Sequence, residues 1–325
     1  MPASGTLEQL AAQVRAHPGL TAKSDIGLVT EVLGPTDWLR GPGDDGAAVP
    51  ALGSHVVACG EALLPAFVRA DPYGAGVAAV LTNLNDLAAM GAEPLGIVDT
   101  IVGDEATARA ALRGMRMASE LYGVPILGGH LTRSDTERAI SAFGVGTARH
   151  PLSMTHVAAG QSIVVAAAVE GQMRADFPFF RSFEARGDRC AADLRVLAEV
   201  ADSGAAVAAK DISMAGVVGS LAMLLEWGGY GAELDLDRLP APTGVELARW
   251  LVAFPSFGFL LCAPPGREVD CLEPFRRRGL CAEVVGRVDG TGQVRLRRAG
   301  QTVPVVDVRA GVTRLHGPTP ATPTS

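Results

Sequence analysis

The sequence predicts an α/β protein of two domains. The chain has 325 residues, more than a single hydrophobic core usually organises. Hydrophobic residues make up 48% of the chain but aromatic residues only 5%, so Ala, Val, Leu and Ile must build the core, as in tightly packed layers of helices and strands. We place the domains at residues 1–155 and 156–310. Residues 311–325 are predicted to be a disordered tail because they are rich in Pro and Thr.

The first domain shows helical and strand patterns in alternation. Apolar residues at helical spacing predict the first helix, in which Thr6 and Gln9 can form a capping box. Alanine-rich sequence predicts a long helix that ends at a left-handed Gly91, and short apolar runs predict the strands. In chain order we expect a helix at 6–17, a strand at 55–59, a helix at 74–90, a strand at 95–102, a helix at 105–122, a strand at 125–130 that breaks into a glycine turn, and a strand at 140–147.

The second domain repeats these patterns after a loosely patterned stretch at 150–160. We expect a strand at 162–169, a helix at 191–201, a glycine-bearing turn and helix at 211–227, a strand at 257–262, and then a further helix and strand before a last short β segment.

Composition and charge exclude several classes of protein. Lys plus Arg number 28 against 35 Asp plus Glu, and no basic cluster is interleaved with aromatic residues, which argues against nucleic acid as a partner. The longest basic run, Arg276 to Arg278, is predicted to lie at a solvated helix end. The five cysteines are scattered without C-x-x-C spacing, so we expect reduced thiols. No signal peptide or membrane span is recognisable, and we expect a soluble, cytoplasmic protein.

Acidic residues at the ends of predicted strands and the starts of helices are the candidate site. No lysine-tipped P-loop is present, so any bound ATP must have its phosphates neutralised through Mg²⁺, which carboxylates hold. Asp44 and Asp45 lie in a glycine-rich loop, Asp86 lies in a helix, and Asp211 precedes another helix. Taken singly, these residues could be turn formers, a polar helix residue and a helix N-cap. Asp86, however, interrupts an apolar run, where an uncompensated buried carboxylate is costly.

A pair of glycines precedes a histidine at the end of a predicted strand. Gly128 and Gly129 would let the backbone approach a ligand, with His130 reaching into the same region. The alternative is a simple turn that carries a surface imidazole.

Four motifs occur in order along the chain: D-D-G-A-A-V at 44–49, T-N-L-N-D-L-A-A-M-G-A-E-P-L at 82–95, G-G-H-L-T at 128–132 and K-D-I-S-M-A-G at 210–216. Together they resemble the aminoimidazole ribonucleotide synthetase (PurM-like) superfamily, which includes thiamine-monophosphate kinase, selenophosphate synthetase and the hydrogenase maturation carbamoyl dehydratase. The resemblance covers residues 23–288. It implies a two-domain PurM-like fold in which the N-terminal domain contributes to a dimeric β-barrel and a C-terminal α/β domain closes over an ATP cleft.

The resemblance also implies which residues bind Mg-ATP. Asp86 and His130 would be catalytic. The nucleotide-binding residues would be Asp44, Asp45, Asn83, Asn85, Asp86, Gly128, Gly129, Lys210 and Asp211. The Mg²⁺ ligands would be Asp44, Asp45, Glu61, Asp86 and Asp211.

The chain also departs from the family pattern. Met214 stands where relatives carry a second acid, Glu61 stands where they carry Asp, and His130 differs from the Asp of the kinases. The reactive Cys of a selenophosphate synthetase and the C-terminal Cys of the carbamoyl dehydratase are missing, because Cys59 lies in a predicted strand and the chain ends in P-A-T-P-T-S. We therefore expect a less characterised, synthetase-related branch.

The expected function is ATP- and Mg²⁺-dependent activation of a carbonyl or amide oxygen of a small molecule by phosphoryl transfer. The alternatives are a small-molecule kinase and a non-catalytic nucleotide-binding subunit. The expected partners are the small-molecule substrate and a second copy of the chain. The segment from Arg174 to Phe183 could recognise an anionic or aromatic substrate, or its Phe residues could plug the domain interface.

Overall fold

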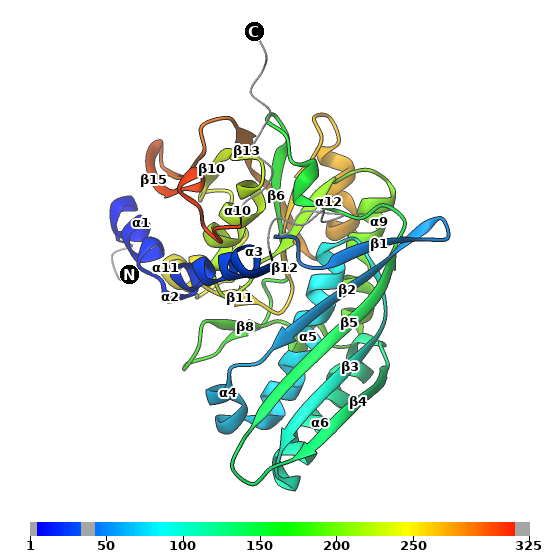
Figure 1. Cartoon of the computed structure of the whole chain (residues 1–325). Helices are drawn as coiled ribbons and strands as arrows, with labels where there is room; N and C mark the ends of the chain where they lie inside the picture. The colour runs from blue at the N-terminus through cyan, green and yellow to red at the C-terminus, as the bar shows by residue number, and fades with distance from the viewer. Residues whose placement is uncertain (1–4, 34–42, 316–325) are drawn as a thin grey trace.

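The structure, a computed structural model, describes residues 5–33 and 43–315. It contains two large sheets flanked by helices, with the N-terminal sheet below the C-terminal one in the view of Figure 1. The predicted α/β class is confirmed. The N-terminal sheet is open, so the described residues of one chain form no closed barrel.

The N-terminal sheet has five strands in the order β1-β2-β5-β3-β4. All neighbouring strands are antiparallel except β3 and β4. The strands are β1 (Ala47–Ala51), β2 (Ser54–Ala62), β3 (Glu93–Gly103), β4 (Ile126–Arg133) and β5 (Ala139–Ala148). The accompanying helices are α4 (Pro65–Ala70), α5 (Pro72–Ala89) and α6 (Glu105–Tyr122).

Helices α5 and α6 lie side by side on one face of this sheet because glycines let their backbones approach closely. A Cβ on Gly76 would lie 2.0 Å from the carbonyl oxygen of Ala111, and one on Gly114 would lie 2.1 Å from that of Tyr73. This close packing fixes the position of α5, which carries Asp86, against α6.

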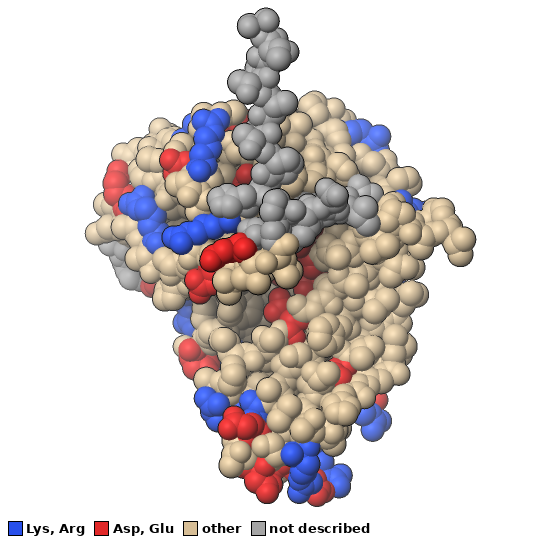
Figure 2. Space-filling view, in the orientation of Figure 1, with Lys and Arg blue, Asp and Glu red and all other residues tan. Residues whose placement is uncertain are grey.

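The other face of the N-terminal sheet is exposed and apolar. Val49, Val56 and Phe143 are 53%, 38% and 46% exposed on strands β1, β2 and β5. Figure 2 shows a broad surface over this sheet with few charged side chains. Exposed apolar patches of this kind mark interaction surfaces.

The C-terminal half contains a seven-stranded sheet in the order β15-β14-β10-β13-β6-β12-β9 and a small sheet in the order β11-β8-β7. The large sheet comprises β6 (Ser162–Ala167), β9 (Ala208–Asp211), β10 (Gly231–Asp235), β12 (Gly258–Ala263), β13 (Cys281–Asp289), β14 (Gln293–Arg298) and β15 (Gln301–Asp307). The small sheet comprises β7 (Gln172–Met173), β8 (Phe179–Arg181) and β11 (Phe254–Pro255).

Helices surround these sheets, and one hydrophobic core joins the two halves of the molecule. Leu84 of α5 belongs to the same buried cluster as Leu197, Phe259 and Phe275 of the C-terminal half. The remaining helices are α1 (Leu7–Arg15), α2 (Pro18–Thr21), η1 (Ala22–Gly27), α3 (Leu28–Leu33), η2 (Met154–His156), α7 (Phe183–Arg186), η3 (Gly187–Arg189), α8 (Cys190–Leu194), α9 (Val196–Asp202), α10 (Gly216–Glu226), α11 (Leu247–Leu251), α12 (Glu268–Arg277) and η4 (Val308–Ala310).

Several predicted elements are found at their expected positions. Thr6 and Gln9 form the predicted capping box, and Gly91 has a φ of +67°. Arg276 and Arg277 lie in the last turn of α12, where their guanidinium groups pair with Glu283 and Glu199. All five cysteines are free. No helix in the described part of the chain has the length and apolar character that crossing a membrane requires.

Other predictions were wrong in detail. Strand β4 does not break at Gly128 but continues to Arg133, because its backbone stays paired with β3. The helix predicted at 191–201 is divided at Arg195 into α8 and α9. Strand β1 was not predicted. Of the tail predicted to be disordered, Val312 and Thr313 are buried and bond Glu226, whereas residues 316–325 lie outside the described residues. Gly41 and Pro42 of the glycine-rich loop also lie outside them.

Candidate functional site

Three carboxylates from distant parts of the chain meet between the two sheets. Asp45 precedes β1, Asp86 lies in the last turns of α5, and Asp211 ends β9. One carboxylate oxygen from each lies within 4.8 Å of the others. We call Asp45, Asp86 and Asp211 the acidic cluster. Figure 2 shows acidic side chains at the hollow between the two lobes of the molecule.

Asp45 links the cluster across the two halves of the molecule. Its carboxylate accepts a hydrogen bond from the backbone N–H of Asp211 (3.0 Å) and another from the ammonium group of Lys210. The side chains of Asp45 and Lys210 are only 6% and 9% exposed. Asp211 is the last residue of a strand, so its alternative role as a helix N-cap does not apply; Ala215 occupies that position before α10.

The cluster carries more negative than positive charge. Burial and the neighbouring carboxylates raise the pKa of Asp86, and burial together with Asp45 raises the pKa of Asp211 to about 7. The pKa of Lys210 is raised by Asp45 and Asp211, which outweigh the opposing effect of its own burial. Lys210 therefore compensates only part of the buried charge. A site of this kind favours a further cation.

Asp44 does not join the cluster in this structure. Its carboxylate accepts hydrogen bonds from the Ser153 hydroxyl (2.5 Å) and the backbone N–H of Met154 (2.7 Å). Burial raises its pKa to about 6, although both hydrogen bonds act in the opposite direction. Asp44 thus anchors the loop that presents Asp45.

The two asparagines of the α5 motif have different roles. Asn83 is fully buried. Its side-chain NH2 group donates to the carbonyl oxygens of Ala79 and Ala142, and its side-chain oxygen accepts a hydrogen bond from the N–H of Gly144. All of these contacts lie within α5 and between α5 and β5, so Asn83 has a structural role in holding the helix on the sheet. Asn85 donates to the carbonyl oxygen of Ser256 (3.3 Å), while its own carbonyl oxygen is buried without a partner among the described residues. That oxygen remains available to a ligand.

Two further charged residues lie at the edge of the cluster. Burial raises the pKa of Glu61 on β2, and the charges of Lys23 and Asp45 act on it in opposite directions. The charge of Lys23 also opposes the rise in the pKa of Asp211. Lys23 lies in none of the four motifs, and the feature of the sequence that sets it apart is that the chain contains only two lysines.

The glycine and histidine motif lies away from the cluster within one chain. Gly128, Gly129 and His130 pair with Val98, Asp99 and Thr100 on the edge strand β4, and all three motif residues are exposed. By the register of β3 with β5, His130 is on the same sheet face as Phe143, opposite the face that α5 covers. A single chain therefore does not place His130 beside Asp86.

The segment from Arg174 to Phe183 is mainly structural. Phe180 is buried against Trp250, and Phe179 stacks on Phe254 with ring centroids 5.0 Å apart. Phe183 belongs to the core that joins the two halves. Arg174 pairs with Asp176 and lies 3.6 Å from Asp71 at the start of α5. The packing favours the interpretation that these Phe residues plug the interface.

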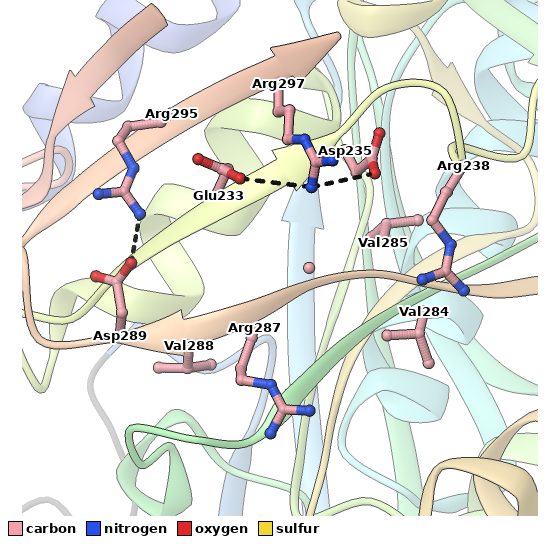
Figure 3. A pocket seen from close by; sticks show the side chains of 11 residues that line it. Glu233, Asp235, Arg238, Val284, Val285, Arg287, Val288, Asp289, Arg295 and Arg297 are labelled. Carbon is pink, nitrogen blue, oxygen red and sulfur yellow. Dashed lines mark hydrogen bonds and ion pairs between the residues drawn. The ribbon is translucent and has the colours of Figure 1, made fainter. Parts of the chain in front are cut away.

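A hollow of about 410 Å³ lies on a different surface, the outer face of β10, β13 and β14 (Figure 3). Arg297 lies between Glu233 and Asp235, 3.9 and 3.8 Å from their carboxylates, and Arg295 pairs with Asp289 (2.5 Å). Arg297 is opposite Asp235 in the strand register, so the charges form a ladder across neighbouring strands. This hollow is a solvated sheet face rather than part of the acidic site.

Comparison with known proteins identifies the family. The model of the AIR synthase related protein N-terminal domain matches residues 43–148, and that of the corresponding C-terminal domain matches residues 154–298. The chain belongs to the AIR synthase related protein family. The uncharacterized protein sll0787 of Synechocystis is 30% identical to this member over 290 residues, which cover 87% of this chain and 90% of that protein.

Solved structures with the same fold include proteins with bound nucleotides. PurL of Thermotoga maritima, complexed with ADP, has a TM-score of 0.77 and 19% identity, covering 96% of this chain and 52% of PurL. AaThiL, complexed with AMPPCP and TMP, has a TM-score of 0.66 and 20% identity, covering 86% of this chain and 93% of AaThiL. This AIR synthase related protein thus spans about half the length of PurL, and the PurM-like fold is confirmed.

Proposed function

We propose that this AIR synthase related protein binds Mg-ATP at the acidic cluster and transfers the terminal phosphoryl group to an oxygen atom of a small molecule. The observation that carries the proposal is the convergence of Asp45, Asp86 and Asp211 within 4.8 Å. The nucleotides bound by Thermotoga PurL and AaThiL support it, because both proteins share this fold.

The cluster suits Mg²⁺ by its chemistry. Magnesium is a hard cation that prefers carboxylate oxygens and usually shares them with phosphate oxygens. The cluster of Asp45, Asp86 and Asp211 would hold it. Glu61 is near enough for its charge to raise the pKa of Asp86. The pKa values of Asp86 and Asp211 are raised, as expected for buried carboxylates that have too little positive charge beside them and would be stabilised by a cation. When bound, the metal would supply charge neutralisation for the phosphates.

The protein's own groups would act mainly by positioning and charge. Lys210 holds Asp45 in place, and Asp44 holds the loop through Ser153 and Met154. Asn85 offers its unpaired carbonyl oxygen to a ligand donor. Phosphoryl transfer needs little covalent chemistry from the protein, so such a rigid arrangement is sufficient for it.

A second copy of the chain is part of this proposal. The exposed apolar face formed by Val49, Val56 and Phe143 fits burial against an identical face. His130 lies on that face, so a catalytic role for His130 requires the second copy to bring it towards the acidic cluster. The five free cysteines support our proposal that the protein works in the reducing cytoplasm.

Titration calorimetry with Mg-ATP tests nucleotide binding directly. We expect binding below millimolar concentration to the wild type, and the absence of any binding at millimolar Mg-ATP would contradict the proposal. Phosphorus NMR of reactions with candidate acceptors then identifies the reaction. Free phosphate together with a condensed product indicates a synthetase-like enzyme, whereas a stable phosphoester indicates a kinase. Binding without turnover of any acceptor would favour a nucleotide-binding subunit.

A further inference from the structure

The chain contains only two lysines, Lys23 and Lys210, and both adjoin the acidic cluster. Every other basic residue that carries a permanent charge is an arginine. Lysine differs from arginine in presenting a compact charge with three donors, which suits a single phosphate oxygen. Lys210 is committed to Asp45. Lys23 therefore needs a separate explanation.

Lys23 is half-buried and has no bonding partner within residues 5–33 and 43–315. Its ammonium group makes neither a hydrogen bond nor an ion pair with those residues. Burial raises the pKa of both Glu61 and Asp211, and the charge of Lys23 partly opposes that rise in each. Lys23 is thus close enough to act on carboxylates from both halves of the molecule, while its donors bond none of the residues that the structure describes.

Packing on either side fixes the position of Lys23. Four residues before it, a Cβ on Gly19 would lie 2.0 Å from the carbonyl oxygen of Met214, in the loop that follows Asp211. Four residues after it, a Cβ on Gly27 would lie 2.8 Å from the Cβ of Arg314. Both glycines allow contacts that any side chain would prevent. The turn that carries Lys23 is therefore held at the cluster by its flanks.

The segment that packs against Gly27, residues 312–314, is itself anchored. Glu226, at the end of α10, accepts hydrogen bonds from the hydroxyl of Thr313 (2.7 Å) and from the backbone N–H of Val312 (2.7 Å). The segment from Gly19 to Gly27 thus packs against the chain at both ends, against Met214 at one end and against residues 313–314 at the other. A turn held at both ends, whose ammonium group has no partner in the described part of the chain, is pre-organised to bind an anion.

We propose that Lys23 binds an oxygen atom of the terminal phosphoryl group of ATP, an assignment that rests on the proposed Mg-ATP function. In the transfer, the acceptor oxygen forms a bond to the terminal phosphorus. The bond from that phosphorus to the bridging oxygen breaks, and its electron pair leaves with ADP. Lys23 donates to the phosphoryl oxygens and stabilises the negative charge on them. It would therefore distinguish ATP, which carries this group, from ADP, which does not.

Calorimetry with two probes tests this assignment. Mg-AMPPCP and Mg-ADP are titrated into the wild type, Lys23→Met, Lys23→Arg and the control Arg15→Met, which removes the same charge from an exposed side chain in the last turn of α1. We expect Lys23→Met to weaken AMPPCP binding about tenfold, the effect of one lost charge-assisted hydrogen bond, and to leave ADP binding unchanged. Lys23→Arg should retain part of the affinity, and Arg15→Met should bind both nucleotides like the wild type.

NMR supplies a second readout that does not depend on mutation. Reductive methylation with ¹³C-formaldehyde keeps the charge of lysine and labels at most two side chains in this protein, besides the N-terminal amine. The Lys23 signal should shift with Mg-AMPPCP but not with Mg-ADP. Equal binding of both nucleotides by Lys23→Met and the wild type, with no selective shift, would overturn the Lys23 assignment alone. A wild type that binds neither nucleotide would overturn the proposed function as well.

Discussion

The carboxylate of Asp45 accepts a hydrogen bond from the backbone N–H of Asp211 at 3.0 Å, although 166 residues separate them in the chain. This contact joins the loop before β1 to the end of β9, and Lys210 binds the other oxygen of the same carboxylate. The acidic cluster is therefore also part of what holds the two halves together. Changes to its residues should affect stability and ligand binding in separable ways.

Asp86→Asn should raise stability while it abolishes metal-dependent nucleotide binding. Asp86 is buried beside other carboxylates, which raises its pKa, so its charged form is costly in the folded protein. Without Mg²⁺ at neutral pH, the neutral amide should therefore increase the free energy of unfolding. Urea denaturation measures this gain, and calorimetry with Mg-AMPPCP measures the loss. A destabilised variant that still binds Mg-AMPPCP would refute this account of Asp86.

Stability without divalent cations should fall as pH rises from about 4 to about 7. Burial raises the pKa of Asp44 to about 6, and burial with Asp45 raises that of Asp211 to about 7, from an ordinary value of 3.8. In this window the folded protein holds protons that the unfolded chain has released, so rising pH favours unfolding. Denaturant titrations across the window should show the fall, with a smaller slope for Asp211→Asn. An increase in stability over the same window would contradict the raised values.

Lys210→Met should destabilise the protein. The substitution leaves the buried Asp45 carboxylate without its cation, a change that typically costs about 3 kcal/mol. The double variant with Asp45→Asn removes both charges and should recover much of that loss. Thermal and urea unfolding of the four proteins form a double-mutant cycle. Additive effects in that cycle would mean that the pair is not coupled.

Phe143→Lys should produce a monomer. Phe143 is 46% exposed on the apolar face of the N-terminal sheet, where a charge would oppose burial against a second copy. Leu112→Lys is a matched control, because Leu112 is 44% exposed on α6, on the opposite side of the sheet. Sedimentation velocity should give a dimer for the wild type and the control. A monomeric wild type would refute the proposed assembly.

Local signals in the sequence predicted the longest helices, whereas the shorter ones were missed or merged. Helix α6 runs over the predicted residues from Glu105 to Tyr122, because Asp104 caps its start and the left-handed Gly123 ends it. Strand β4 shows where local signals fail. Gly128 and Gly129 are typical of a turn, but pairing with β3 keeps them extended. Glycine allows both conformations, and only the neighbouring strand decides between them.

The site was predicted less completely, because its contacts are long-range. The sequence could not distinguish Asn83, whose amide bonds α5 to β5, from Asn85, whose oxygen has no partner among the described residues, since both are polar residues in one apolar helix. Nor could it separate Asp44, which bonds Ser153, from its neighbour Asp45, which bonds Lys210. In each case the partner comes from another element, and only the assembled fold brings it there.

A crystal structure of the protein with Mn²⁺ and AMPPCP tests the central claim most directly, because the anomalous signal of manganese marks the metal position. We predict a peak coordinated by Asp45, Asp86 and Asp211, with the terminal phosphoryl group between the metal and Lys23. The account would be contradicted if the metal and nucleotide bound elsewhere, for example in the charged hollow on β10, β13 and β14. In that case Lys210 would still be the cation bound to Asp45 in the acidic cluster.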